Sequence, residues 1–166
     1  GNSVLALDGR TVLELKGNGL LAPLKARNGM KDSCLPPVSE GQEIAVLDGA
    51  FELRRDARAF VNALVSLRTS VGRSKLIYAP GIAETSNVAI LSYLGVDLFD
   101  TSLVDHRAAI GQLSLSEGSM DASKAGWVPE GSDLVALNRE AMFKEMAMVR
   151  SMISSGRMPA RAAITR

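Results

Sequence analysis

Residues 75–100, KLIYAPGIAETSNVAILSYLGVDLFD, constrain the fold more than any other stretch because they predict a strand, a helix and a second strand in close succession. Residues 75–79 are strand-like and stop at a Pro-Gly pair, which ends strands. Residues 86–94 carry apolar side chains at helical spacing and are followed by a glycine that suits a helix end. Residues 96–99 then read as a short buried strand.

Two parallel strands joined by one helix cross over in the right-handed sense, and their carboxyl ends meet at one edge of the sheet. This arrangement places Pro80, Gly81 and Asp100 at the edge where α/β proteins bind ligands. Asp100 is therefore the first catalytic candidate, as a nucleophile or a base. The alternative, which is the commoner role for an aspartate between a strand and a helix, is that Asp100 caps the helix beginning near Ser102.

The first 42 residues carry a different signal. Residues 4–7 and 11–15 flank Asp8-Gly9, and Asp-Gly between two β-prone runs predicts an antiparallel β-hairpin. The rest of the segment shows no sustained period and reads as irregular connection. We therefore expect residues 1–42 to form an N-terminal hairpin followed by an irregular stretch.

Strand-like and helical stretches alternate over residues 43–156, which predicts βα units and a parallel sheet within one domain. Asp48-Gly49 also suggests a second hairpin, and residues 114–133 read as a surface loop with at most one short strand. The tail, residues 157–166, is basic. The helices expected from apolar periodicity cover residues 56–71, 86–94, 102–110 and 138–154.

Composition narrows the functional classes. The chain has 166 residues with a net charge of +1, so it can form one core, and its overall field does not favour a polyanion. RNA binding would need a local basic patch. One cysteine, Cys34, and one histidine, His106, do not make a zinc site, so we expect no metal and no cofactor. No apolar run is long enough to span a membrane, and no secretory leader opens the chain, which predicts a cytoplasmic protein.

Three weaker candidates complete the list. Residues 17–22 fit the dinucleotide pattern G-x-G-x-x-A, but Pro23 leaves little room for the helix that would hold a pyrophosphate, so a small-molecule site there ranks well below a glycine-rich turn. His106 reads as a solvated helix residue because nothing pairs it with a nucleophile. The arginines near the carboxyl terminus read either as phosphate contacts or, preferably, as a solvated helix end and tail. They are Arg150, Arg157, Arg161 and Arg166.

Several motifs resemble the tRNA-guanine transglycosylase superfamily, and they are most similar to its archaeosine synthase branch. They are LRRD through FVNAL in residues 53–64, YAPG in 78–81, YLGVDLFD in 93–100, and the Ser-Gly-Arg step in 155–157. The resemblance implies a TIM-type barrel that acts on a deazaguanine base in tRNA. In the base-exchanging members the aspartate that closes the FD strand is the nucleophile, and that position falls on Asp100. The archaeosine branch instead adds to the nitrile of a deazaguanine already in tRNA.

The chain departs from this family in three ways. Residues 114–133 contain no cysteine and Asn138 stands near where the last helix opens with a histidine, so the family's zinc site is lost. After Asp100 the chain reads Thr-Ser-Leu, where the transglycosylases have Pro-Thr-Arg. A closed barrel needs about 250 residues. The predicted fold class is therefore α/β: a partial or remodelled (β/α) TIM-type barrel with parallel strands, preceded by an N-terminal β-hairpin.

Together these observations predict a cytoplasmic tRNA-modification protein with Asp100 as its catalytic residue. Tyr78, Pro80 and Gly81 are the expected substrate-binding residues, tRNA is the expected partner, and any enzymatic activity would be that of a transferase. The second hypothesis is a non-catalytic subunit that kept the barrel fragment as an assembly surface. In either case the open sheet edge should be covered by a second copy or by a second subunit that completes the barrel.

Overall fold

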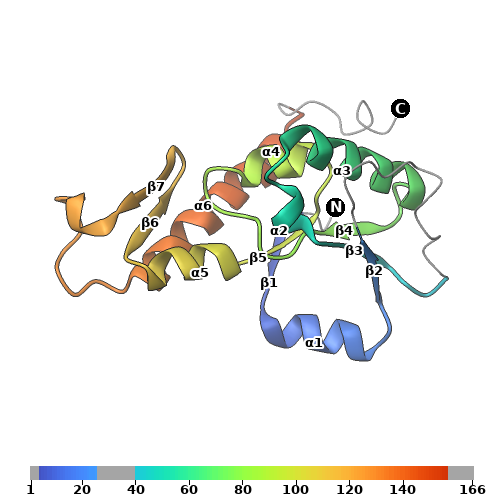
Figure 1. Cartoon of the computed structure of the whole chain (residues 1–166), viewed down its shortest axis with the longest axis horizontal. Coiled ribbons are helices and arrows are strands. Elements are labelled where there is room, and N and C mark those ends of the chain that lie inside the picture. The colour runs from blue at the N-terminus through green and yellow to red at the C-terminus, as the bar shows by residue number, and fades with distance from the viewer. Residues whose placement is uncertain (1–3, 26–39, 157–166) are drawn as a thin grey trace.

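The computed structural model describes residues 4–25 and 40–156. Five parallel strands form one sheet in the order β1-β5-β4-β3-β2, which confirms the predicted parallel sheet (Figure 1). Strands β2 to β5 are neighbours in chain order, and β1 lies beyond β5. The strands are β1 (Leu5–Leu7), β2 (Leu21–Lys25), β3 (Ile44–Asp48), β4 (Leu76–Tyr78) and β5 (Leu98–Asp100).

The four helices predicted from apolar periodicity are present close to their predicted positions, and two of them begin at a capping aspartate. Asp56 caps α3 by accepting a hydrogen bond from the amide of Ala59 at 3.0 Å. Asp133 caps α6 in the same way through Ala136 at 3.1 Å, so this helix begins before the expected residue 138. The helices are α3 (Ala57–Val71), α4 (Val88–Tyr93), α5 (Ser102–Ala109) and α6 (Leu134–Ser154).

The two faces of the sheet are covered differently. Alternate strand residues such as Ile77 and Phe99 are fully buried in a core that also takes in side chains of α3, α4 and α6. The opposite face, with Tyr78 and Leu98, packs against Val12 and other apolar side chains. Figure 1 shows α1 (Gly9–Gly17) lying apart from α3 and α4, on the other side of the strands. Since side chains alternate along a strand, Asp100 shares the α1 face with Leu98.

The prediction of an N-terminal β-hairpin is wrong. Residues 5–7 form β1, which pairs in parallel with β5, but the expected second arm is the helix α1. Asp8 does not turn the chain into a hairpin. Its carboxylate accepts from the amide of Thr11 at 2.7 Å and caps the helix. Asp-Gly suits a tight turn and a helix start equally well, and packing of Val12 and Leu15 against the sheet decides for the helix.

Two further local predictions are also corrected. Gly49, with φ of 78°, leads from β3 into the short helix α2 (Ala50–Leu53) instead of turning into a second hairpin. Residues 114–133, which were predicted to be a surface loop with at most one short strand, contribute to two strands. Strand β6 (Gln112–Leu115) pairs antiparallel with β7 (Gly118–Asp121), and Figure 1 shows this pair extending away from the parallel sheet with α5.

A closed barrel is not formed by the residues that the structure describes. Strand β1 pairs only with β5 there, and β2 only with β3, so the sheet has two ends. Within the same residues no helix is long and apolar enough to cross a membrane.

Candidate functional site

Asp100 ends β5, and its carboxylate joins three elements. One oxygen, Oδ2, accepts from the hydroxyl of Tyr78 at 2.6 Å, and Oδ1 accepts from the amide of Ser102 at 3.0 Å. The amide of Gly81 donates to both oxygens, at 3.1 and 3.2 Å. The adjacency of the two strand ends predicted from the sequence is therefore observed, and the contact with the start of α5 is present as well.

Gly81 can make this contact because of its backbone conformation. Its φ is 73°, in the left-handed region where glycine carries no steric cost. The turn aims its N–H at Asp100. Burial raises the pKa of the Tyr78 hydroxyl, and the hydrogen bond to Asp100 raises it further, so Tyr78 stays protonated and acts as the donor.

Asp100 and Tyr78 line a cleft of about 730 Å³. One wall comes from β1 and the start of α1, and the other from α5 and α6. Leu13 and Phe143 contribute exposed apolar surface to this lining. The cleft therefore combines a half-polar floor with apolar rims, which suits a flat ligand with polar edges.

The α5–α6 wall is held by an ion pair. Arg139 donates two hydrogen bonds of 2.8 Å to the two carboxylate oxygens of Asp105, and the hydroxyl of Thr101 donates to the same group at 3.0 Å. The hydrogen bond from Arg139 is the main cause that lowers the pKa of Asp105 below its ordinary value. All three residues line the cleft.

The ionisable side chains that line the cleft are mostly acidic. Asp8, Asp100 and Asp105 face one cation, Arg139, which is already committed to Asp105. Phosphate groups are repelled by such a lining, whereas hydrogen-bond donors are attracted to it. The geometry therefore favours a ligand that presents N–H groups here and keeps its anionic parts elsewhere.

A second carboxylate on the same strand segment, Asp97, lies at the opposite edge and serves a different purpose. It is buried, and its Oδ2 accepts from Arg68 at 2.6 Å and from the amide of Ile77 at 3.0 Å. Arg68 also donates to three backbone carbonyls, those of Gly72, Lys75 and Gly95. This network ties α3 to β4 and β5, so Asp97 has a structural role.

The predicted site residues are only partly brought together. Tyr78 and Asp100 line the cleft, while Pro80 does not, and Gly81 reaches the site through its amide. His106 is exposed on α5 and takes no part in the lining. Residues 17–22 run from the end of α1 into β2, so the strand-turn-helix context of a dinucleotide site is absent there.

Of the four C-terminal arginines and Cys34, only Arg150 belongs to the described residues. Arg150 donates to the carbonyl of Val4 at 2.7 Å, which fixes the last helix to the first described residue. Cys34 and the three arginines beyond position 156 lie outside the described residues.

Sequence reasoning missed the other polar residues of the cleft. Asp8 had a usable signal, because it directly follows β1 much as Asp100 closes β5, and these two strands pair side by side. Thr101 and Asp105 follow Asp100 closely enough to have been suspected. Arg139 had no signal, since only the packing of α6 against α5 brings it to Asp105.

The resemblance to a zinc-containing family was tested on the residues at the corresponding place. Residues 112–138 supply no thiolate and no imidazole, so they do not fit zinc. Asn138 is 1% exposed and holds this part together instead. Its amide donates to the carbonyls of Val104 and Gln112, at 3.1 and 2.9 Å, and accepts from the amide of Ser114 at 2.9 Å.

Comparison with known proteins bears on the same region of the chain. No protein-family model matches it. Archaeosine synthase subunit alpha from Methanosarcina acetivorans is 26% identical over 135 residues, which is 69% of this chain and 22% of that protein. The protein of the same name from Thermoplasma acidophilum is 27% identical over 74 residues, 45% of this chain and 14% of that protein.

The chain is related to archaeosine synthase subunit alpha. It spans about a fifth or less of the length of these relatives. This similarity supports the resemblance to archaeosine synthase that the motifs suggested.

Proposed function

We propose that the chain acts in modification of a deazaguanine base in tRNA, with the base bound in the cleft beside Asp100. The relationship to archaeosine synthase subunit alpha supports the substrate class. The shape and charge of the cleft support the placement, because a guanine-like edge carries N–H donors that match an acidic lining. A cytoplasmic location follows from such a substrate.

Asp100 is the proposed catalytic residue, acting as nucleophile or base. The observation that carries this assignment is its position: it is a carboxylate that reaches the cleft from the carboxyl end of a parallel strand and is held only by uncharged donors. Pairing with an arginine would neutralise the charge of the carboxylate, as Arg68 does for Asp97. Asp100 keeps its charge available to a ligand.

Tyr78 then controls whether the carboxylate of Asp100 can react. A carboxylate offers about four acceptor positions, and the hydroxyl of Tyr78 together with the amides of Gly81 and Ser102 uses them in the resting arrangement. Reaction at Oδ2 requires the Tyr78 hydroxyl to turn toward the ligand. Tyr78 can do so because only its hydroxyl, at the cleft, must move.

The alternative function is a non-catalytic subunit, and one specific observation favours it. The same saturated hydrogen bonding lets Asp100 act as a brace that joins β4, β5 and α5, with no free lone pair for chemistry. In that case the fold serves as an assembly surface within a larger tRNA-modifying protein.

The sheet itself is proposed to be part of a TIM-type barrel. Strands β2 to β5 follow one another in space as they do in sequence, which is the order found in such barrels. The open edges at β1 and β2 are proposed to be covered by a second copy or by another subunit.

Light scattering during size-exclusion chromatography tests this covering and should show a dimer or a stable complex. A well-behaved monomer that also fails to associate with a candidate subunit would remove this part of the proposal.

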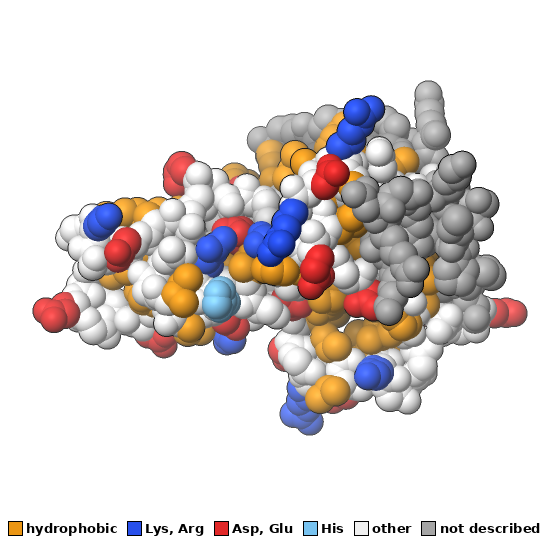
Figure 2. Space-filling model, viewed as in Figure 1, with side chains coloured by type: hydrophobic (Ala, Val, Ile, Leu, Met, Phe, Trp, Pro, Cys, Tyr) orange, Lys and Arg blue, Asp and Glu red, His pale blue; other side chains and the backbone are white. Residues whose placement is uncertain are grey.

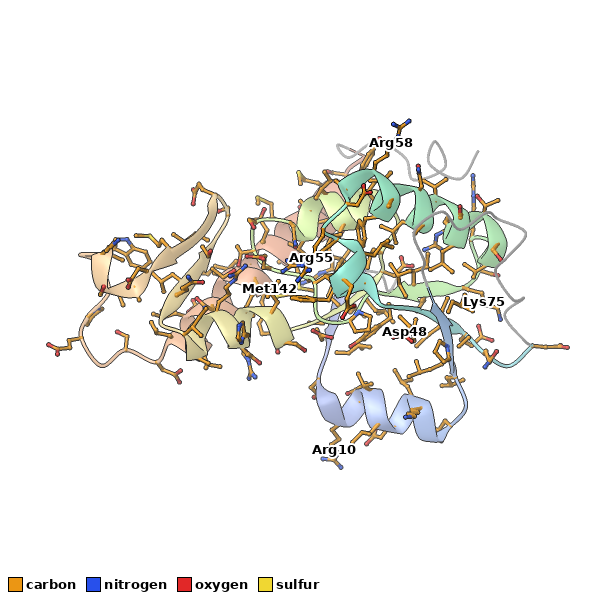
Figure 3. All side chains as sticks on the ribbon, in the orientation of Figure 1. Arg10, Asp48, Arg55, Arg58, Lys75 and Met142 are labelled. Carbon is orange, nitrogen blue, oxygen red and sulfur yellow. The ribbon has the colours of Figure 1, made fainter. Side chains whose placement is uncertain are left out.

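The test of catalysis compares Asp100→Asn with Asp48→Asn in a tRNA-modification assay read by nucleoside mass spectrometry. Asp48 also ends a strand at the carboxyl edge, but it is exposed and lies outside the cleft (Figure 3). If Asp100 is catalytic, its substitution should lower the rate by about 10²–10⁴-fold, as loss of an acid–base group does. The control should stay near the original rate.

Tyr78→Phe separates catalysis from bracing. It removes one of the two hydrogen bonds to Oδ2 of Asp100 and leaves the ring in place. In the catalytic case this variant keeps measurable activity while Asp100→Asn does not. In the bracing case both variants lose activity only in proportion to their loss of stability in urea, and the catalytic assignment fails.

A further inference from the structure

A second hollow lies on the other side of the sheet, between the start of α3 and α4. It is a groove of about 450 Å³, and its lining combines two arginines with apolar side chains and no carboxylate. Its lining residues are Arg54, Arg55, Ala57, Phe60, Val61, Ile82, Asn87, Ile90, Leu91 and Leu94. Ile90 leaves 59% of its surface exposed, so part of the apolar floor faces solvent.

Neither of the two arginines takes part in the ion pairs found in the described part of the chain. The guanidinium of Arg54 stacks over the ring of Phe51, with 4.3 Å to the ring centroid. Arg55 is exposed in the turn between α2 and α3, and Arg58 follows on α3. The nearby Asp56 turns an oxygen onto the amide of Ala59. By contrast, an acidic partner is present for Arg10, Arg68, Lys75, Arg107, Arg139 and Lys144.

The groove opens at the same edge of the sheet as the cleft. Arg54 and Arg55 follow α2, which itself follows the carboxyl end of β3, and Ile82 follows the carboxyl end of β4. Figure 2 shows basic and hydrophobic side chains together on the visible face over α2 and α3, and Figure 3 places Arg55 and Arg58 there. A ligand that runs along this edge can therefore meet both hollows.

The charges of the two hollows are opposite. The cleft is lined by three carboxylates and one guanidinium, whereas the groove is lined by two guanidinium groups. A nucleic acid presents bases with N–H donors and a backbone with one negative charge per phosphate, and guanidinium groups bind phosphate through paired N–H bonds. An extended substrate of this kind needs an acidic pocket for one base and cations for its backbone.

We propose that the groove binds an unpaired nucleotide of the tRNA, with its phosphate held by Arg54 and Arg55 and its base against the apolar floor. This inference rests on the proposed function in tRNA modification. Exposed bases stack on arginine planes and apolar surfaces whatever their identity. The side-chain amide of Asn87 accepts from the amide of Glu84 and donates to the carbonyl of Ile82, which holds it against the backbone. We expect the base to be held by stacking, so binding here should tolerate any base.

The test measures binding of fluorescently labelled tRNA to the full 166-residue chain by anisotropy at salt concentrations from 50 to 300 mM. The variant Arg54→Gln/Arg55→Gln is compared with Arg73→Gln/Lys144→Gln, which removes the same charge. Arg73 precedes β4 at the opposite edge of the sheet, and Lys144 is exposed on α6. Neither lines the groove or the cleft.

The salt dependence gives the expected result. Each neutralised phosphate adds about 0.7–0.9 to the slope of log affinity against log salt, so the groove variant, which loses the cations at one phosphate, should lose about 0.7–0.9 of slope. Its affinity at low salt should fall on the order of tenfold. The control should keep the original slope. Equal slopes in the two variants would overturn the phosphate contact while leaving the proposed tRNA function standing.

A second arm tests the base. A short oligouridylate is compared with an abasic oligonucleotide of equal length, and the original chain should prefer the oligouridylate. Ile90→Asp, at an exposed position, should remove that preference without unfolding the chain. If the preference survives Ile90→Asp, the base does not lie in the groove and the inference fails.

Two other results would overturn the proposed nucleotide site. A synthetic amphipathic peptide rich in glutamate that binds the original chain, but not the arginine variant, would identify the groove as a protein docking site if tRNA binding is unchanged. Such a result overturns the inference. If the original chain retains no tRNA at all, the proposed function fails first and the nucleotide site fails with it.

Discussion

Asp97 and Asp100 lie three residues apart on one short strand segment, yet they occupy opposite edges of the sheet and have opposite environments. Asp97 is neutralised by the buried guanidinium of Arg68, which also ties three backbone carbonyls together. Asp100 is held by a hydroxyl and two amides and reaches a cleft. A buried carboxylate with a cation partner stabilises a fold, while one with only neutral donors keeps a charge for a ligand.

The largest expected effect is at the Asp97 edge. Arg68→Met removes the guanidinium and leaves the buried carboxylate of Asp97 without its cation, which should cost about 3–5 kcal/mol of unfolding free energy. Urea denaturation followed by circular dichroism measures this loss. Arg58→Met, on the same helix but exposed, is the matched control and should change stability by less than about 0.5 kcal/mol. A loss of similar size in both variants would contradict the structural role of the Arg68–Asp97 pair.

The next effect concerns the part of the chain that frames the cleft. Asn138→Ala removes three hydrogen bonds and leaves the buried backbone groups of Val104, Gln112 and Ser114 without this partner, which should cost about 2–4 kcal/mol. Asn62→Ala, at an exposed position of α3, serves as the control in the same urea titration. If Asn138→Ala unfolds like the control, the amide does not organise this region.

The Asp100 edge should respond less in stability and more in function. Asp100→Asn keeps the size of the side chain but places an amide nitrogen among donors, and we expect a loss of about 1–3 kcal/mol. This loss should be smaller than that of Arg68→Met while the effect on tRNA modification is larger. Parallel denaturation and activity measurements on both variants check this order, and the reverse order would remove the contrast between the two edges.

The smallest effect is the pH dependence of the Asp105–Arg139 pair. In the folded chain the hydrogen bond from Arg139 lowers the pKa of Asp105 below its ordinary value of 3.8. The ion pair therefore stabilises the fold above pH 3.8. This stabilisation is lost as the pH falls from about 3.8 through the lowered pKa of Asp105 in the folded chain. Because Arg139 is nearly half exposed, the effect should stay below about 1 kcal/mol.

Comparing the original chain with Asp105→Asn at pH 7 and pH 3 checks this prediction. The difference in unfolding free energy between them should be smaller at pH 3 than at pH 7, because pH 3 lies below 3.8, where the contribution of the lowered pKa of Asp105 declines. A difference that is constant with pH would show that the ion pair adds nothing beyond its hydrogen bonds.

The sequence by itself determined the elements with strong local signals. Apolar spacing defined α3, and the βαβ pattern of residues 75–100 placed Asp100 beside the end of β4. These signals work because apolar periodicity and the right-handed crossover of a βαβ unit are both contained in a short stretch of chain.

Tertiary structure alone decided the rest. Asp8-Gly9 suits both a hairpin turn and a helix start, and only the packing of Val12 on the sheet selected the helix. Arg139 reached the cleft because α6 packs on α5, and Arg54 and Arg55 line a groove because α3 and α4 are neighbours. Such contacts join residues that are distant in the chain, and their free energy appears only when both elements are in place, so no local pattern records them.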